Sequence, residues 1–271
     1  MDDAIKNYFV DPGTKLKLSK IDASDTSCFP KGKKAALKKI KKLSEQIEEM
    51  QELLYAEKKH RLLVVLQGMD TSGKDGTIRH VFEGVNPQGV KVASFKKPTQ
   101  LELDHDFLWR IHPHVPAKGE IVIFNRSHYE DVVVVRVHKL VSKEQIKKRY
   151  DHINAFEKML YDEGTTILKF YLHIDKDEQK ARLLARKNDK AKQWKLSEND
   201  VPERQLWDDY IEAYEDAIKK TSQKHAPWFV IPANHKWYRN YLISKIILHT
   251  LTKMDIKTPE PSFDVSKLEI I

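Results

Sequence analysis

One short segment limits the folds open to this chain more than any other. Residues 62–67 form an apolar run rich in leucine and valine, and a glycine-bracketed loop follows at once and closes in Gly73-Lys74. A buried strand that leads through such a loop into a helix is typical of a phosphate-binding loop, whose backbone N–H groups and lysine ammonium point at phosphate oxygens. The segment therefore predicts an α/β fold with a phosphate site at the end of a buried strand.

The loop carries two carboxylates at unusual places. The residue after Lys74 is normally Ser or Thr, whose hydroxyl helps to hold Mg²⁺, but here it is Asp75, and Asp70 lies inside the loop. A carboxylate among phosphate-binding N–H groups is unfavourable unless a cation or proton donor offsets it. We therefore expect Asp70 to ligate Mg²⁺ or to orient an acceptor oxygen, the structural alternative being a local backbone hydrogen bond. The expected phosphate-binding residues of the loop are Gly68, Thr71, Ser72, Gly73, Lys74, Asp75 and Gly76.

Composition narrows the class of protein. The 271 residues can bury a sizeable core, and a formal net charge of +8 favours an anionic partner, namely nucleic acid, an acidic membrane surface or a phosphate-rich substrate. No apolar run approaches the ~20 residues that span a membrane, and the first residues do not resemble a signal peptide. Cys28 is the single cysteine, which excludes an internal disulfide and fits a reducing compartment. We therefore expect a cytoplasmic protein.

Strand and helix patterns alternate along the chain. Strands are expected at 62–67, 89–95, 120–124, 166–174 and 227–231, and helices at 74–85, 101–112, 142–162, 176–187, 202–222 and 237–253. This alternation predicts a P-loop kinase-like three-layer sandwich, with a parallel sheet of about five strands between helices. Ligands of such sheets bind at the carboxyl ends of the strands. The expected division is an extended N-terminal arm at 1–30, the kinase-like domain at 31–255 and a tail at 256–271.

A further helix is predicted from Lys31, since apolar residues recur there at steps of three and four. Lysines crowd its first half and glutamates its second half. The lysines either form a solvated face with i,i+4 pairs or extend an anion-binding track.

A dense polar cluster follows strand 120–124. In phosphoryl-transfer enzymes the residue at this strand end is usually acidic and contacts Mg²⁺ through water, whereas Asn125 is a neutral and weaker ligand. Arg126 can bind phosphate oxygens bidentately, the alternative being an ordinary ion pair with a neighbouring acid. Glu130 and Asp131 suit an amino group or ribose hydroxyl of a nucleotide, or support of Arg126. The candidate metal ligands are thus Asp70 and Asn125.

Two further segments complete the predicted site. Arg182 and Arg186 lie four residues apart on one helix face, and lysines that include Lys192 follow. We interpret about 182–200 as a mobile basic lid over phosphates, the alternative being a basic surface segment. The expected nucleotide-binding residues are Lys96, Pro98, Thr99, Arg110, Asn125, Glu130 and Asp131.

Taken in order, these motifs make the chain resemble the polyphosphate kinase 2 family over roughly residues 30–255. The resemblance rests on Gly68-x-Asp70-x-x-Gly73-Lys74-x-Gly76, Phe124-Asn125-Arg126-Ser127-x-Tyr129, Arg186-x-x-Asp189 with Lys192-x-Trp194-Lys195-x-Ser197, and Trp207-Asp208-Asp209-Tyr210 with Ala213-Tyr214. It implies reversible transfer of a terminal phosphate from inorganic polyphosphate to a nucleoside mono- or diphosphate, with Mg²⁺ or Mn²⁺, by a dimer or tetramer. His128-Tyr129-Glu130-Asp131 resembles the subgroup that accepts both AMP and ADP, and guanine nucleotides are further candidate acceptors.

The expected catalytic residues are Asp70, Lys74, Arg126 and Arg186, with positioning and charge neutralisation as their main contributions. Two other functions stay open at this point. One is an ATP-dependent nucleotide kinase of the thymidylate-kinase type. The other is a basic nucleic-acid-binding protein, which is disfavoured because the chain lacks interleaved stacking aromatics and a groove-reading helix. We therefore expect neither a nucleic acid nor a membrane partner.

Overall fold

The computed structural model describes residues 3–270, and within them the predicted three-layer sandwich is confirmed. Its six-stranded sheet has the order β1-β6-β5-β2-β4-β3. β2 to β6 run parallel, and β1 pairs antiparallel with β6 at one edge. The strands are β1 (Phe9–Val10), β2 (Arg61–Gln67), β3 (Val90–Ser94), β4 (Ile121–Asn125), β5 (Thr165–His173) and β6 (Trp228–Pro232).

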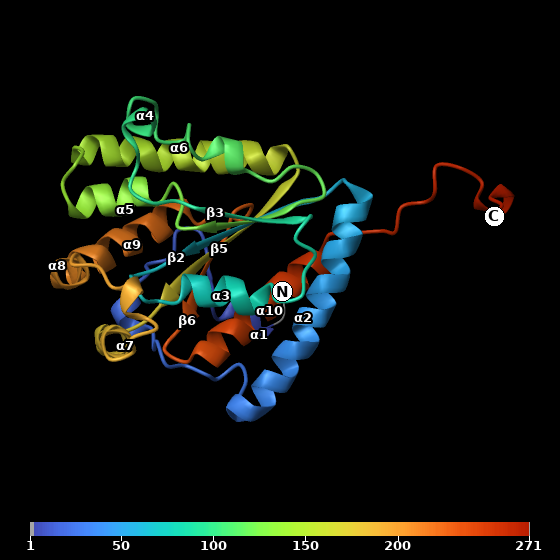
Figure 1. The fold of residues 1–271 in the computed structure, drawn as a ribbon. Coiled ribbons are helices and arrows are strands. Elements are labelled where there is room, and N and C mark those ends of the chain that lie inside the picture. The colour runs from blue at the N-terminus through green and yellow to red at the C-terminus, as the bar shows by residue number, and fades with distance from the viewer. Residues whose placement is uncertain (1–2, 271) are drawn as a thin grey trace.

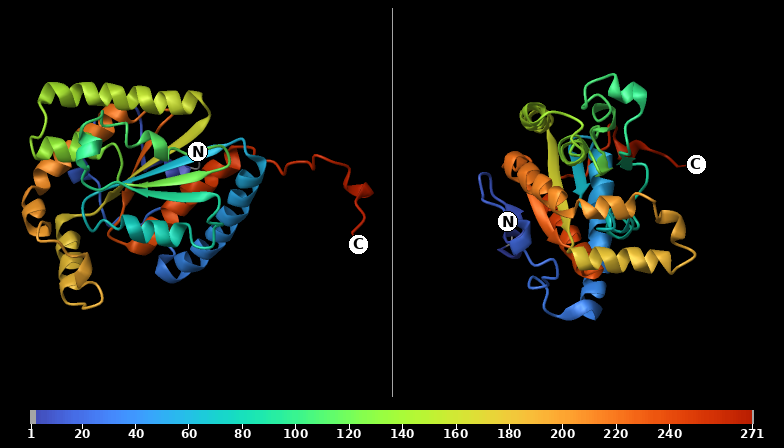
Figure 2. Two further views of the ribbon diagram at one scale, coloured as in Figure 1. Left: turned by 45° about the horizontal axis from the view of Figure 1, so that its top comes forward. Right: turned by 90° about the vertical axis from the view of Figure 1, so that its left-hand side faces the viewer.

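Helices cover both faces of the sheet (Figure 1; Figure 2). α2, α3 and α10 pack together on one face, and α5, α6 and α9 pack on the other. Within the described residues the helices are α1 (Asp3–Lys6), α2 (Gly32–Glu57), α3 (Lys74–Val81), α4 (Gln100–Leu103), α5 (Glu130–Val137), α6 (Lys143–Asp162), α7 (Lys176–Lys187), α8 (Asp200–Gln205), α9 (Trp207–Thr221) and α10 (Lys236–Lys253). Among the residues that the structure describes, no helix is long and apolar enough to cross a membrane.

The central strands form because their side chains are buried on both faces. Five consecutive residues of β2, Leu62 to Leu66, are fully enclosed, as expected for a strand that lies between β5 and β4. The five predicted strands are therefore confirmed, each within two residues at its ends. Since all five are parallel, their carboxyl ends meet at one edge, and the loop after β2 lies there.

One predicted helix was largely wrong, a second one is interrupted, and two helices, α1 and α5, were not predicted. Only the first residues of the expected helix at 101–112 are helical, because Asp106 Oδ1 accepts a hydrogen bond from the Leu108 N–H and turns the chain. The expected helix at 202–222 breaks at Leu206 into α8 and α9. α5 contains four consecutive valines, whose strand propensity is overridden because part of this run and Val137 pack into the core.

The ends of the chain differ from each other. The predicted N-terminal arm is not merely extended, since it contains α1 and β1, and Ile5, Tyr8 and Leu18 are buried. Its Leu18 N–H donates to Glu215 Oε1 at 2.8 Å. The tail from 256 instead projects from the body and is exposed along most of its length (Figure 2).

Candidate active site

The loop after β2 has the geometry that its glycines require. Gly68 has φ +147° and Gly73 has φ +105°, and a Cβ at Gly68 would lie 2.8 Å from the Leu172 carbonyl oxygen. Gly73 is the residue before the first turn of α3, so the loop ends at a helix N-terminus, where backbone N–H groups lack helical partners. The predicted strand–loop–helix unit is therefore confirmed, and it presents an anion-binding surface.

Lys74 is the first residue of α3 and is largely buried. Its Nζ donates to the carbonyl oxygens of Gly68, at 2.8 Å, and Met69, at 3.4 Å. Burial lowers the pKa of Lys74, although the nearby Asp70 carboxylate opposes that shift. The ammonium is thus held beneath the loop by neutral oxygens, a poor substitute for water, and an incoming phosphate would improve its environment.

Asp70 and Arg126 face each other across the site. An Arg126 Nη2 donates to Asp70 Oδ1 at 2.8 Å, and both side chains are about two-fifths exposed. Arg126 has φ +62°, a left-handed conformation that is energetically costly for a residue with a Cβ. Its backbone N–H donates to the Leu66 carbonyl at 3.1 Å, which aims the side chain at the loop.

The surroundings shift the pKa values of Asp70 and Glu130, two acids close to Arg126, in opposite directions. Burial alone would raise the pKa of Asp70, but Lys74 and Arg126 outweigh it and hold this pKa below its usual value. At Glu130 the effect of burial is larger than that of the same two cations, so the pKa of its carboxyl group is raised. The pKa values of the two carboxyl groups are therefore shifted in opposite directions by the same surroundings.

The strand-end amide contacts the second unusual acid. Asn125 Nδ2 donates to Asp75 Oδ1 at 2.8 Å, which leaves the amide oxygen of Asn125 for another partner. This contact connects β4 to the first turn of α3. No group of three or more His, Cys, Asp or Glu side chains among the described residues is arranged to hold a metal ion. A metal here would need the substrate's phosphates as ligands, as is usual for Mg²⁺.

A buried ion pair supports the strand end from below. Lys169 Nζ donates to Glu157 Oε2 at 2.5 Å, to the Tyr129 hydroxyl at 2.9 Å and to the Thr221 carbonyl at 2.8 Å. Both charged side chains are excluded from water, and His128 also contacts Glu157 at 3.2 Å. His128 and Tyr129 follow Arg126 closely in sequence, so this network fixes the turn that carries Arg126. Sequence reasoning missed it, because a lysine inside an apolar strand gives no sign of its partner.

Arg182 has a different role from the predicted one. It is buried on α7, and its five N–H groups donate to Glu178 and to the carbonyl oxygens of Thr71, Ser72, Ala233 and Asn234. No donor is left for phosphate. The expected phosphate contact is therefore corrected to a positioning role, in which Arg182 ties the loop to the segment after β6.

The predicted nucleotide-binding residues divide into two groups. Arg110 donates to the Lys96 carbonyl at 2.9 Å and to Asp131 Oδ2 at 3.2 Å, so these residues form one network on the cavity wall. Pro98 also lies on that wall. Thr99 instead accepts a hydrogen bond from the Glu102 N–H as the N-cap of α4 and does not line the cavity. Thr99 was expected to bind the nucleotide, but in the structure its side chain caps α4 instead.

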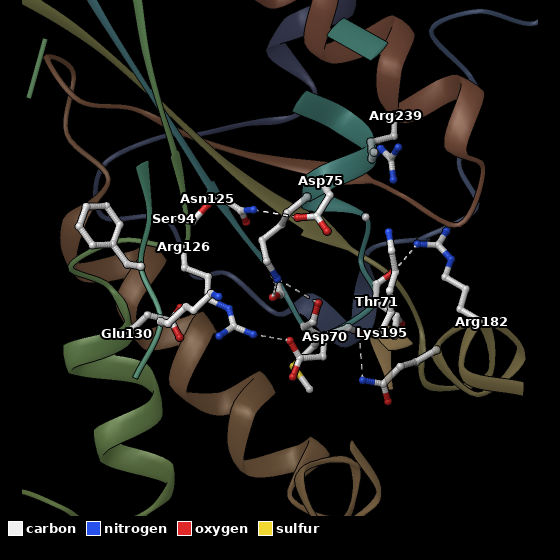
Figure 3. Close-up of a pocket in the computed structure, with 18 of the residues that line it drawn as sticks. Asp70, Thr71, Asp75, Ser94, Asn125, Arg126, Glu130, Arg182, Lys195 and Arg239 are labelled. Carbon is white, nitrogen blue, oxygen red and sulfur yellow. Dashed lines mark hydrogen bonds and ion pairs between the residues drawn. The ribbon is translucent and has the colours of Figure 1, made fainter. Parts of the chain in front are cut away.

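One cavity of about 2100 Å³ contains the site. The loop, Arg126 and the basic segment after α7 share its wall, and Arg186 and Lys192 also lie there, where phosphate binding by them stays a prediction. Of the loop residues only Ser72 is enclosed behind the wall. Figure 3 shows Arg126 and Glu130 on one side of the loop and Arg182 and Arg239 on the other. The volume exceeds the 300–1,000 Å³ of an ordinary small-molecule pocket, so it has room for two substrates.

Comparison with known proteins follows the same motifs. The family model described as polyphosphate kinase 2 matches residues 30–259. The chain belongs to the polyphosphate kinase 2 family. The predicted family and the prediction of an enzyme of this family are thereby confirmed.

Relatives in this family extend over nearly the whole chain. An AMP/ADP-polyphosphate phosphotransferase of Meiothermus ruber is 56% identical over 266 residues, which cover 98% of this chain and 100% of that protein. An ADP-polyphosphate phosphotransferase of Rhodopseudomonas palustris is 40% identical and covers 94% of this chain and 92% of its own length. The crystal structure of polyphosphate kinase 2 from Arthrobacter aurescens TC1 has a TM-score of 0.94 at 42% identity, and the match covers 97% of this chain and 94% of that one.

Proposed function

We propose that this chain transfers the terminal phosphate of inorganic polyphosphate to AMP and to ADP, reversibly and with a divalent metal ion. The observation that carries this proposal is the full-length similarity, at 56% identity, to a relative named for both acceptors. The geometry supports it, because an acid-bearing phosphate loop and Arg126 face one large cavity.

The transfer proposed here is an in-line displacement. An ionised phosphate oxygen of the nucleotide attacks the terminal phosphorus of polyphosphate, the new P–O bond forms, and the bond to the bridging oxygen breaks. The shortened polyphosphate leaves with the electron pair of that bond. Since the attacking oxygen is already ionised at neutral pH, no proton has to be removed from it, and the enzyme contributes positioning and charge stabilisation.

Each catalytic residue has a place in this scheme. Lys74 and the loop N–H groups hold the phosphate that is transferred, and Arg126 and Arg186 neutralise charge that moves to the bridging oxygen. Asp70 accepts a hydrogen bond of 2.8 Å from Arg126, which holds the guanidinium in position, and the Asp70 carboxylate stays ionised beside it. Glu130, whose pKa is raised, lies on the acceptor side with Arg110 and Asp131.

The donor set fits Mg²⁺, and Mn²⁺ by the same chemistry. The second carboxylate oxygen of Asp70 and the amide oxygen of Asn125 are hard oxygen ligands, and substrate phosphates would complete the shell. When bound, the metal would neutralise phosphate charge. We further propose adenine nucleotides as preferred acceptors, guanine nucleotides as secondary ones, and a dimer or tetramer as the active form.

A panel of acceptors tests this function. Purified protein is incubated with long-chain polyphosphate, Mg²⁺ and AMP, ADP, GMP or GDP in turn, and the products are separated by chromatography. We expect ADP from AMP and ATP from ADP. Samples without polyphosphate expose dismutation of two ADP to ATP and AMP, which would imitate the expected product. Phosphorylation that requires ATP and ignores polyphosphate would instead support an ATP-dependent nucleotide kinase.

A further inference from the structure

Three consecutive carbonyl groups of the phosphate loop are held by side chains of α7. Gln179 Nε2 donates to the Asp70 carbonyl oxygen at 3.2 Å. Arg182 Nη1 donates to the carbonyl oxygens of Thr71 and Ser72, at 2.9 Å each (Figure 3). In a trans peptide the C=O and N–H groups point to opposite sides, and no described peptide bond is cis. By holding these carbonyl groups, α7 determines where the N–H groups of the loop point.

Thr71 in particular needs such support. Its φ of +67° is a left-handed conformation that is energetically costly for a residue with a Cβ. The Arg182 guanidinium that holds its carbonyl group also donates to the carbonyl oxygens of Ala233 and Asn234, at 2.6 and 3.1 Å. The segment after β6 is therefore the support to which Arg182 ties the strained loop.

The side chain of Asn234 connects this segment to the start of α7. Its Nδ2 donates to Asp175 Oδ2 at 2.6 Å, and its Oδ1 accepts a hydrogen bond from the Asp175 N–H at 3.3 Å. Asp175 is the N-cap of α7, and its Oδ1 accepts from the Glu178 N–H at 2.7 Å. Burial alone would raise the pKa of Asp175, but the hydrogen bonds from Glu178 and Asn234 outweigh it and lower that pKa. An ionised Asp175 can only accept, so the amide NH₂ of Asn234 has to face it.

The N-terminal arm covers the same asparagine. The backbone N–H of Asn234 donates to the Ala23 carbonyl at 3.1 Å, and its Nδ2 donates to Ser24 Oγ at 2.8 Å. Asn234 is half-buried and lies outside the cavity wall. Any effect of its side chain on the reaction must therefore pass through Asp175 and Arg182.

We propose that Asn234 is a positioning residue of the phosphate transfer. Through Asp175 it fixes the start of α7, and α7 holds the carbonyl groups of the loop so that the loop N–H groups face the transferred phosphate. This inference rests on the proposed function, since the phosphate that the loop holds is the one that is transferred. Small displacements matter here, because a shift of about 1 Å between reacting groups can cost about 100-fold in rate.

An exchange of the two hydrogen-bonding partners tests the inference. Asn234→Asp places a second carboxylate against Asp175 and removes the hydrogen bond between the side chains. The double variant Asn234→Asp/Asp175→Asn restores one donor and one acceptor and keeps a side chain that caps α7. The measured quantities are kcat and KM for ADP, with saturating polyphosphate, and the midpoint of urea unfolding. We expect kcat of Asn234→Asp to fall about 10- to 100-fold at unchanged KM, and the double variant to recover most of this loss.

Asn154→Asp is the matched control for a merely structural effect. Asn154 is also half-buried, and its Nδ2 donates to the Lys220 carbonyl at 3.0 Å, away from the cavity. This variant should lower the unfolding midpoint and leave kcat unchanged. The same behaviour of Asn234→Asp would overturn the inference, and so would a double variant that regains its unfolding midpoint but not its kcat.

A binding measurement separates this inference from the proposed function. Tripolyphosphate is titrated into each variant in a calorimeter without nucleotide, so that the result does not depend on turnover. Weaker binding by Asn234→Asp, recovered in the double variant, supports the positioning role even if no phosphate is transferred. Absence of turnover in the unmodified protein counts against the proposed function only, and equal affinities in all the variants of such a protein would overturn the positioning role.

Discussion

Lys74→Met separates the catalytic function of the phosphate loop from its stability. Methionine has nearly the length of lysine and removes the ammonium, whose Nζ contacts the Gly68 carbonyl at 2.8 Å and the Met69 carbonyl at 3.4 Å. Loss of one preorganised oxyanion-hole donor costs about 2.7–4 kcal/mol, and we expect a similar loss here, so that kcat should fall about 100- to 1,000-fold.

Stability should respond much less. The pKa of Lys74 is lowered, which means that the fold disfavours its charged form relative to water. Removing that charge relieves a burial cost, while the two carbonyl oxygens lose a donor and the Asp70 carboxylate loses a cation that stabilises its charge. Because these effects oppose each other, we expect the free energy of unfolding to change by less than about 1 kcal/mol.

The assay combines polyphosphate-dependent ATP formation with urea unfolding of the same preparation. A matched control is Lys253→Met at the exposed end of α10, which should change neither quantity. Turnover of Lys74→Met close to that of the unmodified protein would refute the assignment of this loop to the transferred phosphate. A large loss of stability would refute the claim that burial of the ammonium is unfavourable.

Three other predictions concern stability and pH. Lys169→Met leaves the Glu157 carboxylate buried without its lysine and should lower the free energy of unfolding in urea by about 3–5 kcal/mol. The double variant Lys169→Met/Glu157→Leu should lose less stability than the single variant. Additive losses in the double variant would contradict the pairing. Gly73→Ala should lose both activity and stability, since its Cβ would lie 1.9 Å from a guanidinium nitrogen of Arg239. Gly164→Ala has φ +89° and free space around the new Cβ, so it should show only the cost of backbone strain, about 1–3 kcal/mol. Similar losses in both variants would be contrary to this reasoning. The raised pKa of Glu130 means that its proton stabilises the folded state in acid, and this contribution is lost as pH rises through that pKa. Glu130→Gln should therefore remove this slope from unfolding free energies measured as pH is raised from about 4. An unchanged slope would show that Glu130 is not its source.

The sequence predicts the sheet well because the signal is local. Leu62 to Leu66 form a continuous apolar run, which is typical of a strand buried on both faces in an α/β fold, and the glycine-rich loop that follows marks its end. The loop follows for the same reason, since its glycines and Lys74 are contiguous. α5 could not be found in this way, because its valines favour a strand and only their packing makes the segment helical.

Side-chain roles that depend on distant partners lie beyond local patterns. Arg182 and Arg186 look equivalent in the sequence. In the structure the guanidinium of Arg182 donates hydrogen bonds to the carbonyl oxygens of four residues, whereas Arg186 lies on the cavity wall. Arg239 gives no sequence signal at all, although it packs against Gly73. A helix pattern with one arginine near its start is too common to indicate a site, whereas the absence of a nearby acid is visible only in three dimensions.

The identity of the phosphate donor is the central claim, and an isotope experiment tests it most directly. Radiolabelled polyphosphate is supplied with unlabelled ADP and Mg²⁺, in the absence of any nucleoside triphosphate, and the position of the label in ATP is determined. We predict that the label enters the γ-phosphate of ATP, and that Lys74→Met slows its appearance about 100- to 1,000-fold. Unlabelled ATP that accumulates together with AMP, or no ATP until another triphosphate is added, would contradict polyphosphate as the donor.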